Sequence, residues 1–219
     1  MVAKYYVLIM DIIDSSSIPD RDILTEKLER AMSHANKEFS RDCFSPFEIT
    51  RGDEIATVLV SAARVYPMIR IFREVLFPVD IRSILLYDEL KAGLETRRST
   101  VIDGPAFYRG NRMMMELKKT QKTFALDTQQ KEMDETAEAL MNLLLWQWNN
   151  FSELQQQIIR LYQKEKNQKD VAKQINRTQQ QVNKTLNSCK WEIIDNAEKA
   201  IMHMFQLIDE ANATTGSGK

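Results

Sequence analysis

The sequence predicts an α+β fold in which a ferredoxin-like domain of order βαββαβ precedes an all-α helix-turn-helix domain. Apolar, β-branched runs alternate with segments of helical period as far as about residue 128. Strand signals stop there, and the rest of the chain reads as polar helices rich in Gln and Asn. We therefore expect domains at 1–128 and 129–212, followed by a disordered tail at 213–219.

The first domain follows from hydrophobic period and turn residues. Residues 5–13 form a continuous apolar run, which is typical of a strand buried on both faces. Gly52 and Asp53 separate two short apolar runs, which indicates a tight hairpin. The expected elements, in order, are a strand at 5–13, a helix from Pro19-Asp20 to Phe39, strands at 47–51 and 54–60, a helix at 64–76, a strand at 80–87, a helix from Pro105 to Lys119 and an edge strand at 123–126.

The second domain reads as a series of helices with recognisable ends. Ser152 and Gln155 have the spacing of a capping box. Asn176 can adopt the left-handed conformation that ends a helix, and Thr178 is suited to cap the next one. The expected helices are at 136–149, 152–163, 168–175, 179–189 and 191–211. The last could form a homodimer or close the helical core.

Bulk composition is that of an ordinary globular protein. The chain has 219 residues, of which 43% are hydrophobic and 28% charged, and its net charge is −1. Cys43 and Cys189 lie far apart and have no metal-binding spacing, which favours a reducing compartment over a disulfide scaffold. No apolar run approaches the roughly 20 residues of a membrane span. We expect a cytoplasmic protein without a membrane partner.

Asp11 and Asp53 are the candidate metal ligands. Asp11 falls within the first apolar run, and Asp53 lies in the hairpin turn. In the βαββαβ plan the end of strand one lies beside the start of strand three, so the two carboxylates should meet. Mg²⁺ is commonly held by one or two carboxylates together with phosphate oxygens. Each aspartate could instead be structural, one as a helix cap and the other as a turn residue.

Three segments together resemble the SatD family over roughly residues 4–126. They are Val7-Leu8-Ile9-Met10-Asp11-Ile12-Ile13-Asp14-Ser15-Ser16, Ile49-Thr50-Arg51-Gly52-Asp53-Glu54 and Asp103-Gly104-Pro105-Ala106-Phe107-Tyr108-Arg109. More distantly, the first two are similar to the catalytic palm of class III nucleotidyl cyclases and GGDEF-type diguanylate cyclases. That resemblance implies Mg²⁺ or Mn²⁺ ligands at Asp11 and Asp53, with Glu54 assisting any catalysis. Ile12 directly follows Asp11, and its carbonyl could also face the metal. The strand at 83–87 lacks the glycines usual in relatives.

Nucleotide contacts are expected at three further residues. Gly52 would let the backbone approach a nucleotide closely. Arg109 and Arg112 are three residues apart on one helix face and could bind phosphates, although a solvated face is the alternative. No residue pair that would select a base is recognisable.

The segment from Gln168 to Asn187 has helix-turn-helix spacing. Between Arg160 and Lys190 there are eight basic residues and two acidic ones, in a chain that is otherwise acidic. A local basic patch of this kind is the usual footprint of DNA binding. The candidate DNA contacts are Lys169, Arg177, Gln179, Gln180, Gln181, Asn183, Lys184 and Asn187. The segment from Ser152 onward resembles the helix-turn-helix of sigma-factor region four; a polar bundle without DNA contacts is the alternative.

These observations favour a nucleotide-responsive DNA-binding regulator, with duplex DNA and a nucleoside triphosphate or other nucleotide as partners. The alternative is a metal-dependent nucleotidyl cyclase or polymerase-like enzyme that makes a cyclic or oligonucleotide product. A third hypothesis is a non-catalytic scaffold. Only the enzyme requires chemistry at Asp11, Asp53 and Glu54.

Overall fold

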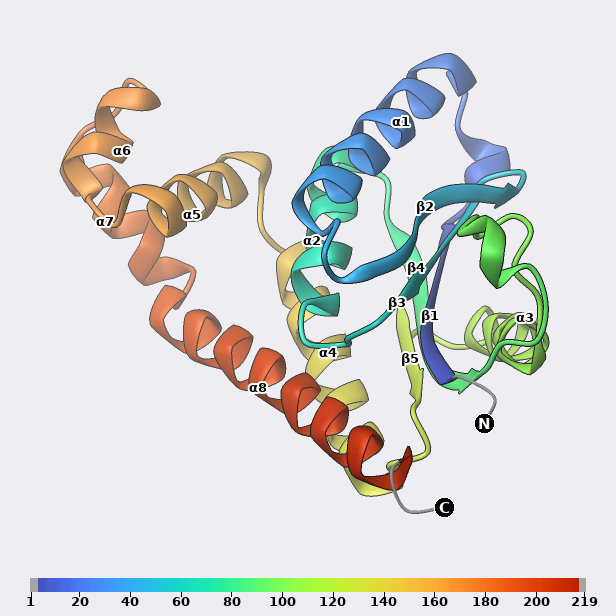
Figure 1. Cartoon of the computed structure of the whole chain (residues 1–219). Coiled ribbons are helices and arrows are strands. Elements are labelled where there is room, and N and C mark those ends of the chain that lie inside the picture. The colour runs from blue at the N-terminus through green and yellow to red at the C-terminus, as the bar shows by residue number, and fades with distance from the viewer. Residues whose placement is uncertain (1–3, 217–219) are drawn as a thin grey trace. The chain divides into compact units, whose positions relative to one another are not determined.

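A computed structural model describes residues 4–216 and shows an α+β fold with one mixed five-stranded sheet and eight α-helices in that range (Figure 1). The strands are β1 (Lys4–Ile12), β2 (Cys43–Arg51), β3 (Glu54–Leu59), β4 (Ile81–Glu89) and β5 (Phe124–Asp127). The helices are α1 (Arg21–Glu38), α2 (Val65–Leu76), α3 (Pro105–Leu117), α4 (Lys131–Asn149), α5 (Glu153–Glu165), α6 (Gln168–Gln174), α7 (Gln179–Ser188) and α8 (Trp191–Gly216).

The sheet has the strand order β2-β3-β1-β4-β5. β1 occupies the centre and is antiparallel to both β3 and β4, while β5 runs parallel to β4 at one edge. β1 is buried along almost its whole length, which explains its unbroken apolar run. The central strand therefore presents side chains to helices on both faces.

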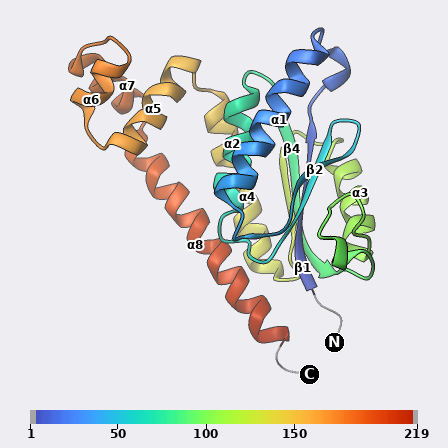
Figure 2. The same ribbon diagram turned by 45° about the horizontal axis from the view of Figure 1, so that its top comes forward.

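Helices α1 and α2 cover one face of the sheet and α3 covers the other (Figures 1 and 2). On the α3 face, Val7 and Ile9 of β1 pack with Ile84 of β4 in a core that includes Met114 and Leu117 of α3. Gly110 allows α3 to approach closely, because a Cβ atom there would lie 2.7 Å from the Cδ1 atom of Ile9. The alternation along β1 consequently places every second residue after Ile9, beginning with Asp11, on the α3 face.

The chain forms two compact units whose boundaries fall inside helices. The first comprises the described residues up to Met141 together with those from Ile201 onward, and the second comprises Asn142–Ala200. The sequence places the boundary near residue 128 instead. The difference arises because the beginning of α4 and the end of α8 belong with the sheet: Phe205 of α8 packs edge-on against Phe124 of β5, with ring centroids 6.4 Å apart.

The second unit has its own core and buried polar contacts. Val171 and Ala172 of α6 and Val182 and Leu186 of α7 are buried. The Nε1 atom of Trp148 donates a hydrogen bond to Glu198 at 3.0 Å, and this contact joins α4 to α8 within the unit. Trp148 is thus a core residue, in keeping with its position on a helical stripe.

Several element ends differ from the sequence-based expectation. β2 begins at Cys43 rather than at residue 47, because a register shift lets the edge strand continue past Pro46. α4 begins at Lys131 rather than at 136. α8 continues to Gly216, so the first four residues of the expected disordered tail are helical, and 217–219 lie outside the described residues. No helix of the described chain is both long and apolar enough to cross a bilayer.

Candidate metal and nucleotide site and candidate DNA-binding surface

Asp11 and the hairpin that carries Asp53 lie at the same end of the sheet. The antiparallel pairing of β1 with β3 reaches Met10 opposite Ile55. Asp11 is the next residue of β1, and Glu54 and then Asp53 are the next residues toward the hairpin turn. The fold therefore brings together two segments that are far apart in the sequence.

Asp11 lies in a row of charged residues that crosses three strands. Arg82 of β4 lies directly opposite Asp11 of β1. Residues directly opposite in antiparallel strands project from the same face of the sheet. Glu54 lies on the other side of Asp11 in β3. Above this row, Lys118 immediately follows α3, and its Nζ atom lies 2.9 Å from Oδ2 of Asp11. The Asp11 residue is only 9% exposed, which strengthens this ion pair relative to one in open water.

Asp53 has a carboxylate oxygen that is buried and has no hydrogen-bond partner. It follows Gly52, whose positive φ of 59° closes the two-residue turn between Arg51 and Glu54. The Oε1 atom of Glu54 accepts a hydrogen bond from the Thr50 hydroxyl at 2.9 Å, which fixes the side chain of Glu54 beside the turn. A buried anionic oxygen without a donor is unfavourable, and a cation is the natural partner for it.

The other two residues expected at this site have defined environments. Ile12 is the last residue of β1; it is 3% exposed and pairs with Ile81 of β4. Gly52 is exposed, and a Cβ atom there would meet nothing within 4 Å. The positive φ of the turn explains why glycine occupies this position. A close approach of the backbone to a nucleotide stays a prediction.

The residues present fit a hard divalent cation. Asp11 and Asp53 are carboxylates at one end of the sheet, and one oxygen of Asp53 lacks any donor. No group of three His, Cys, Asp or Glu side chains converges as a metal cluster within the described residues. A metal at this place would thus have two protein carboxylates and would take its remaining oxygen ligands from phosphate and water, which is the usual arrangement for Mg²⁺.

Arg109, expected from the sequence to bind phosphate, is engaged away from Asp11 in this structure. Its guanidinium forms ion pairs with Asp88 of β4 and Asp127 of β5. Asp88 pairs with Tyr5, six residues before Asp11 along β1. At about 3.3 Å per strand residue, this is roughly 20 Å from Asp11. The sequence could not reveal this, because α3 runs along the sheet and places its first turns at the opposite end from Lys118.

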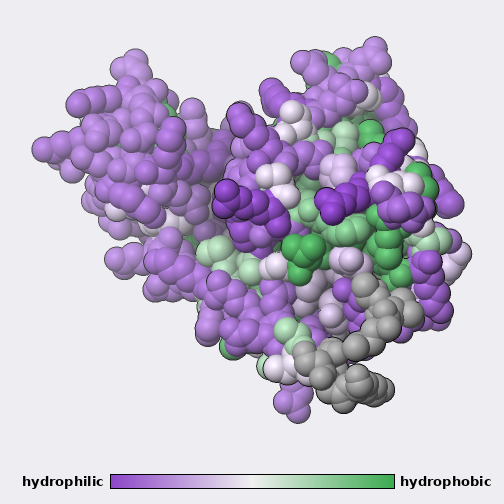
Figure 3. Space-filling view, in the orientation of Figure 1, coloured by the Kyte–Doolittle hydropathy of each residue, from purple (hydrophilic) through white to green (hydrophobic). Residues whose placement is uncertain are grey.

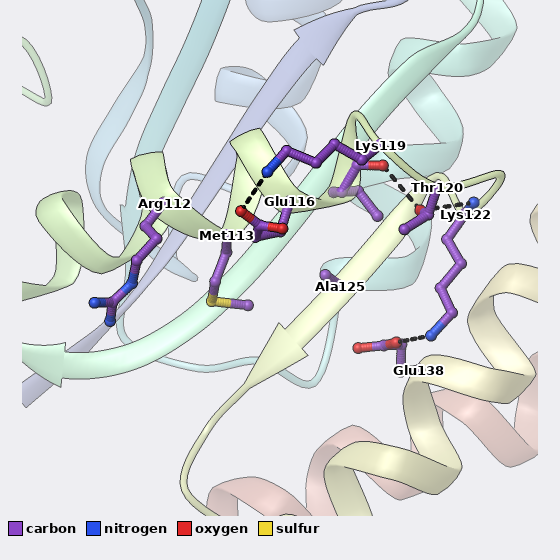
Figure 4. A pocket seen from close by; sticks show the side chains of 9 residues that line it. Arg112, Met113, Glu116, Lys119, Thr120, Lys122, Ala125 and Glu138 are labelled. Atoms are coloured by element: carbon purple, nitrogen blue, oxygen red, sulfur yellow. Dashed lines mark hydrogen bonds and ion pairs between the residues drawn. The ribbon is translucent and has the colours of Figure 1, made fainter.

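Arg112 lines a shallow pocket of about 570 Å³ beside α3, β5 and the beginning of α4 (Figure 4). Two ion pairs cross its surface, Lys119 with Glu116 and Lys122 with Glu138, each at 2.8 Å. Arg112 itself is exposed and points away from these pairs in Figure 4. The two arginines expected to act together are therefore in different environments.

The helix-turn-helix segment has well-formed ends. Asn176 adopts the left-handed conformation with φ 52°, as predicted. The hydroxyl of Thr178 accepts a hydrogen bond from the backbone N–H of Gln181 at 3.2 Å, and Oε1 of Gln181 accepts one from the N–H of Thr178 at 3.0 Å. This capping box starts α7, and Ser152 and Gln155 form the predicted one at the start of α5.

All eight candidate DNA-contacting residues are exposed. In α7, Val182 and Leu186 are buried, and at 100° per residue Gln180, Lys184 and Asn187 lie on the opposite side of the helix. Figure 3 shows that the visible surface of α5–α7 is almost entirely hydrophilic. Across Asn142–Ala200 there are nine Lys and Arg residues and six Asp and Glu residues, so this unit is basic although the chain is not.

Two of these eight residues have their side chains engaged within the protein. Gln181 closes the capping box, and the side-chain oxygen of Asn183 accepts a hydrogen bond from Gln168 at 3.3 Å. These two side chains thus have a structural role in this conformation, and their role in reading bases stays a prediction. The capping-box spacing from Thr178 to Gln181 was itself a sequence signal for that role.

Sequence reasoning did not identify Lys118 and Arg82 as members of the site. Lys118 is one of many lysines in the chain, and only the path of α3 brings it to Asp11. Arg82 becomes adjacent to Asp11 through the β1–β4 register. Charged residues in an otherwise apolar strand were the available signal for Arg82, whereas Lys118 had none.

Comparison with known proteins places the chain in a family. Among solved structures, it is similar to a bacterial light-regulated adenylyl cyclase with 14% identity and a TM-score of 0.37, over 57% of this chain and 76% of that one. This likeness is too slight to support an argument about fold or activity. The comparison with curated proteins gives no match. The model of the SatD family matches residues 5–208, which span both compact units, and the chain belongs to the SatD family.

Proposed function

We propose that this protein is a nucleotide-responsive DNA-binding regulator. The second unit would bind duplex DNA through α6 and α7, a helix-turn-helix similar to sigma-factor region four. The sheet, with its βαββαβ order, would serve as a palm-like domain that binds a Mg²⁺–nucleotide complex at Asp11 and Asp53. The observation that carries the proposal is the outer face of α7, where Gln180, Lys184 and Asn187 are exposed on a helix anchored by its opposite side.

The chemistry of this face suits duplex DNA. Amide side chains such as Gln180 and Asn187 can form paired hydrogen bonds with adenine edges in the major groove. Lys184 can bind a phosphate or a guanine, Lys169 lies in α6, and Arg177 lies in the turn before α7. α6 and α7 also have the lengths expected of a helix-turn-helix, with the second helix entering the groove.

The test is anisotropy of fluorescently labelled duplexes over a range of salt concentrations. Lys184→Gln should weaken binding and reduce the slope of log K against log salt by about 0.9, the value for one lost phosphate contact. Lys37→Gln, on an exposed lysine of α1, is the matched control and should leave the slope unchanged. If no duplex shows salt-sensitive binding, DNA recognition is not the output of this protein.

The nucleotide-binding half is supported by the surroundings of Asp53. Its partnerless buried oxygen lies at the same end of the sheet as Asp11, and the two carboxylates together would supply the oxygen ligands that Mg²⁺ commonly takes from a protein. When bound, such a metal neutralises phosphate charge. The chain's own residues would hold it through the two carboxylates, while Thr50 keeps Glu54 in place through its hydrogen bond.

A binding experiment tests this half independently of DNA. Mn²⁺, which can be followed by electron paramagnetic resonance, should bind to the wild-type protein and bind much more weakly to Asp53→Asn. The same variant should remove any effect of Mg²⁺ and nucleoside triphosphate on duplex affinity. Glu95→Gln, on an exposed acid outside the site, serves as a control. A duplex affinity that never changes with nucleotide would leave a DNA-binding protein without the proposed regulation.

The second candidate is a metal-dependent nucleotidyl cyclase or polymerase-like enzyme. The row formed by Glu54, Asp11 and Arg82 favours it, because a carboxylate and a guanidinium then flank the proposed metal-binding carboxylate of Asp11. Incubation with each nucleoside triphosphate and Mg²⁺ or Mn²⁺, followed by mass spectrometry, decides it. A new product that is lost in Asp53→Asn would establish an enzyme, and no product would leave the site as a sensor.

A further inference from the structure

Two cationic side chains lie at Asp11, and neither belongs to the expected set of nucleotide ligands. Lys118 reaches the site from the end of α3, with its Nζ atom 2.9 Å from the carboxylate of Asp11. Arg82 reaches it from β4, as the cross-strand partner of Asp11. Of the two arginines expected from the sequence, Arg109 is bound by two carboxylates about six residues away along the sheet, and Arg112 lines the separate pocket.

The hydrogen bonding of this cluster is incomplete at two buried atoms. The Nε atom of Arg82 is buried and has no hydrogen-bond partner, and the same holds for Oδ2 of Asp53. Both atoms are strong hydrogen-bonding groups whose burial without a partner is costly. One needs an acceptor and the other needs a donor or a cation. A bound species that carries both a metal ion and anionic oxygens would satisfy both.

Lys118 has the freedom to change partners. Its side chain is 47% exposed, whereas that of Asp11 is 12% exposed. Lys118 lies at the C-cap of α3, at the end of the helix, and its side chain ends in a flexible stem. An ammonium can therefore neutralise Asp11 in the unliganded protein and move to a phosphate oxygen when a divalent cation takes over the carboxylate.

We propose that Lys118 and Arg82 form the phosphate-binding subsite of this site, and that the ligand class is a metal-complexed triphosphate. The proposal rests on the metal–nucleotide half of the proposed function and supplies the cations that it lacked. Arg82 would bind phosphate oxygens from the floor of the sheet, and Lys118 from the end of α3. Lys118 also competes with the metal ion for Asp11. It should therefore lower the affinity for the metal ion alone and raise the affinity for the metal-complexed triphosphate.

The test uses Mn²⁺ alone and inorganic tripolyphosphate with Mg²⁺ as separate probes, measured by electron paramagnetic resonance and by calorimetry. Lys118→Gln should bind Mn²⁺ more tightly than the wild type and bind Mg²⁺–tripolyphosphate about tenfold more weakly, the size expected for one lost charge-assisted hydrogen bond. Arg82→Gln should also lose about tenfold for tripolyphosphate. Lys118→Arg should recover most of the tripolyphosphate affinity.

Lys37→Gln is the matched control, since Lys37 is an exposed cation of α1, which covers the other face of the sheet from α3. Its tripolyphosphate affinity should equal that of the wild type. Thermal unfolding of each variant separates a loss of binding from a loss of structure. If the wild type binds Mn²⁺ and Asp53→Asn does not, but Lys118→Gln and Arg82→Gln bind tripolyphosphate normally, the subsite is wrong and the metal site stands. If the wild type does not bind Mn²⁺ at all, the metal site and the subsite both fail.

Discussion

Asp209, near the end of α8, accepts a hydrogen bond from the backbone N–H of Ala62 at 2.8 Å. The hydroxyl of Ser61 donates to the same carboxylate at 2.5 Å. Both partners precede α2, so the last turns of α8 are fastened to the segment between β3 and α2. One turn further on, the side-chain amide of Asn212 donates a hydrogen bond to the buried hydroxyl of Tyr6 at 2.9 Å. These contacts explain why the end of α8 belongs to the sheet-containing unit.

Replacing Asp209 should therefore destabilise this unit. Asp209→Ala leaves the N–H of Ala62 without its acceptor, and a buried donor without a partner costs about 1–3 kcal/mol. We expect a loss of about 2 kcal/mol in urea unfolding followed by circular dichroism. Glu210→Ala, at the next and exposed position, should change the unfolding free energy by less than about 0.5 kcal/mol. Equal effects of the two changes would show that the Asp209 contacts contribute nothing.

Arg109 should prove to be a structural residue. Arg109→Met removes the cation between Asp88 and Asp127 and leaves two carboxylates close together at the ends of β4 and β5. Because these groups are partly exposed, we expect about 1–2 kcal/mol of destabilisation rather than the larger cost of a fully buried pair. Tripolyphosphate affinity, measured on the folded variant, should stay at the wild-type value. A selective loss of that affinity would return Arg109 to the ligand site.

Local sequence signals predicted most elements, because they depend on neighbouring residues. The capping box at Ser152, the N-cap at Thr178 and the left-handed Asn176 each follow from the preferences of a few side chains, and the structure contains all three. Asp11 and the Asp53 hairpin also came together at one end of the sheet, because strand pairing follows from the order of elements.

Contacts set by the path of a helix could not be predicted in this way. Lys118 and Arg109 lie nine residues apart on or just after α3, yet one meets Asp11 and the other meets Asp88 at the opposite end of β1. Which end each one reaches depends on the direction in which α3 crosses the sheet. The unit boundary was missed for a similar reason, since α8 is continuous in sequence character while its two halves pack in different cores.

The thiol of Cys43 should react slowly at ordinary pH. Burial raises the pKa of Cys43 to about 11, although a hydrogen bond involving Thr57 opposes the shift. At pH 8 roughly one thiol in a thousand would be ionised, and only the thiolate is nucleophilic. Alkylation by iodoacetamide should therefore be slow at pH 8 and accelerate as the pH approaches 11. Mass spectrometry of the labelled peptide measures this rate.

The same shift has a consequence for stability. The pKa of Cys43 is higher in the folded protein than in the unfolded chain, so the folded state holds its proton more tightly. The protonated Cys43 thiol contributes its full stabilisation at any pH below the pKa of the unfolded chain. This contribution declines as the pH rises from that value toward 11, the pKa in the folded protein. Cys43→Ala should remove this alkaline dependence, and a rapid reaction of native Cys43 at pH 8 would contradict the expected burial.

Asn176 offers a test of how α7 is held. Its φ of 52° lies in the left-handed region, which an alanine adopts only at a cost of about 1–2 kcal/mol, while glycine adopts it freely. Asn176→Ala should lower the stability of the second unit by about 1 kcal/mol, and Asn176→Gly should leave it unchanged or slightly raised. Because Asn176 is exposed, neither change alters a buried contact.

If α7 binds DNA as proposed, Asn176→Ala should also weaken duplex binding while Asn176→Gly retains it, since a distorted turn misplaces Gln180 and Lys184. Anisotropy at a temperature where both variants are folded distinguishes this effect from simple unfolding, and equal binding by the two variants would mean that the turn does not control the presentation of α7.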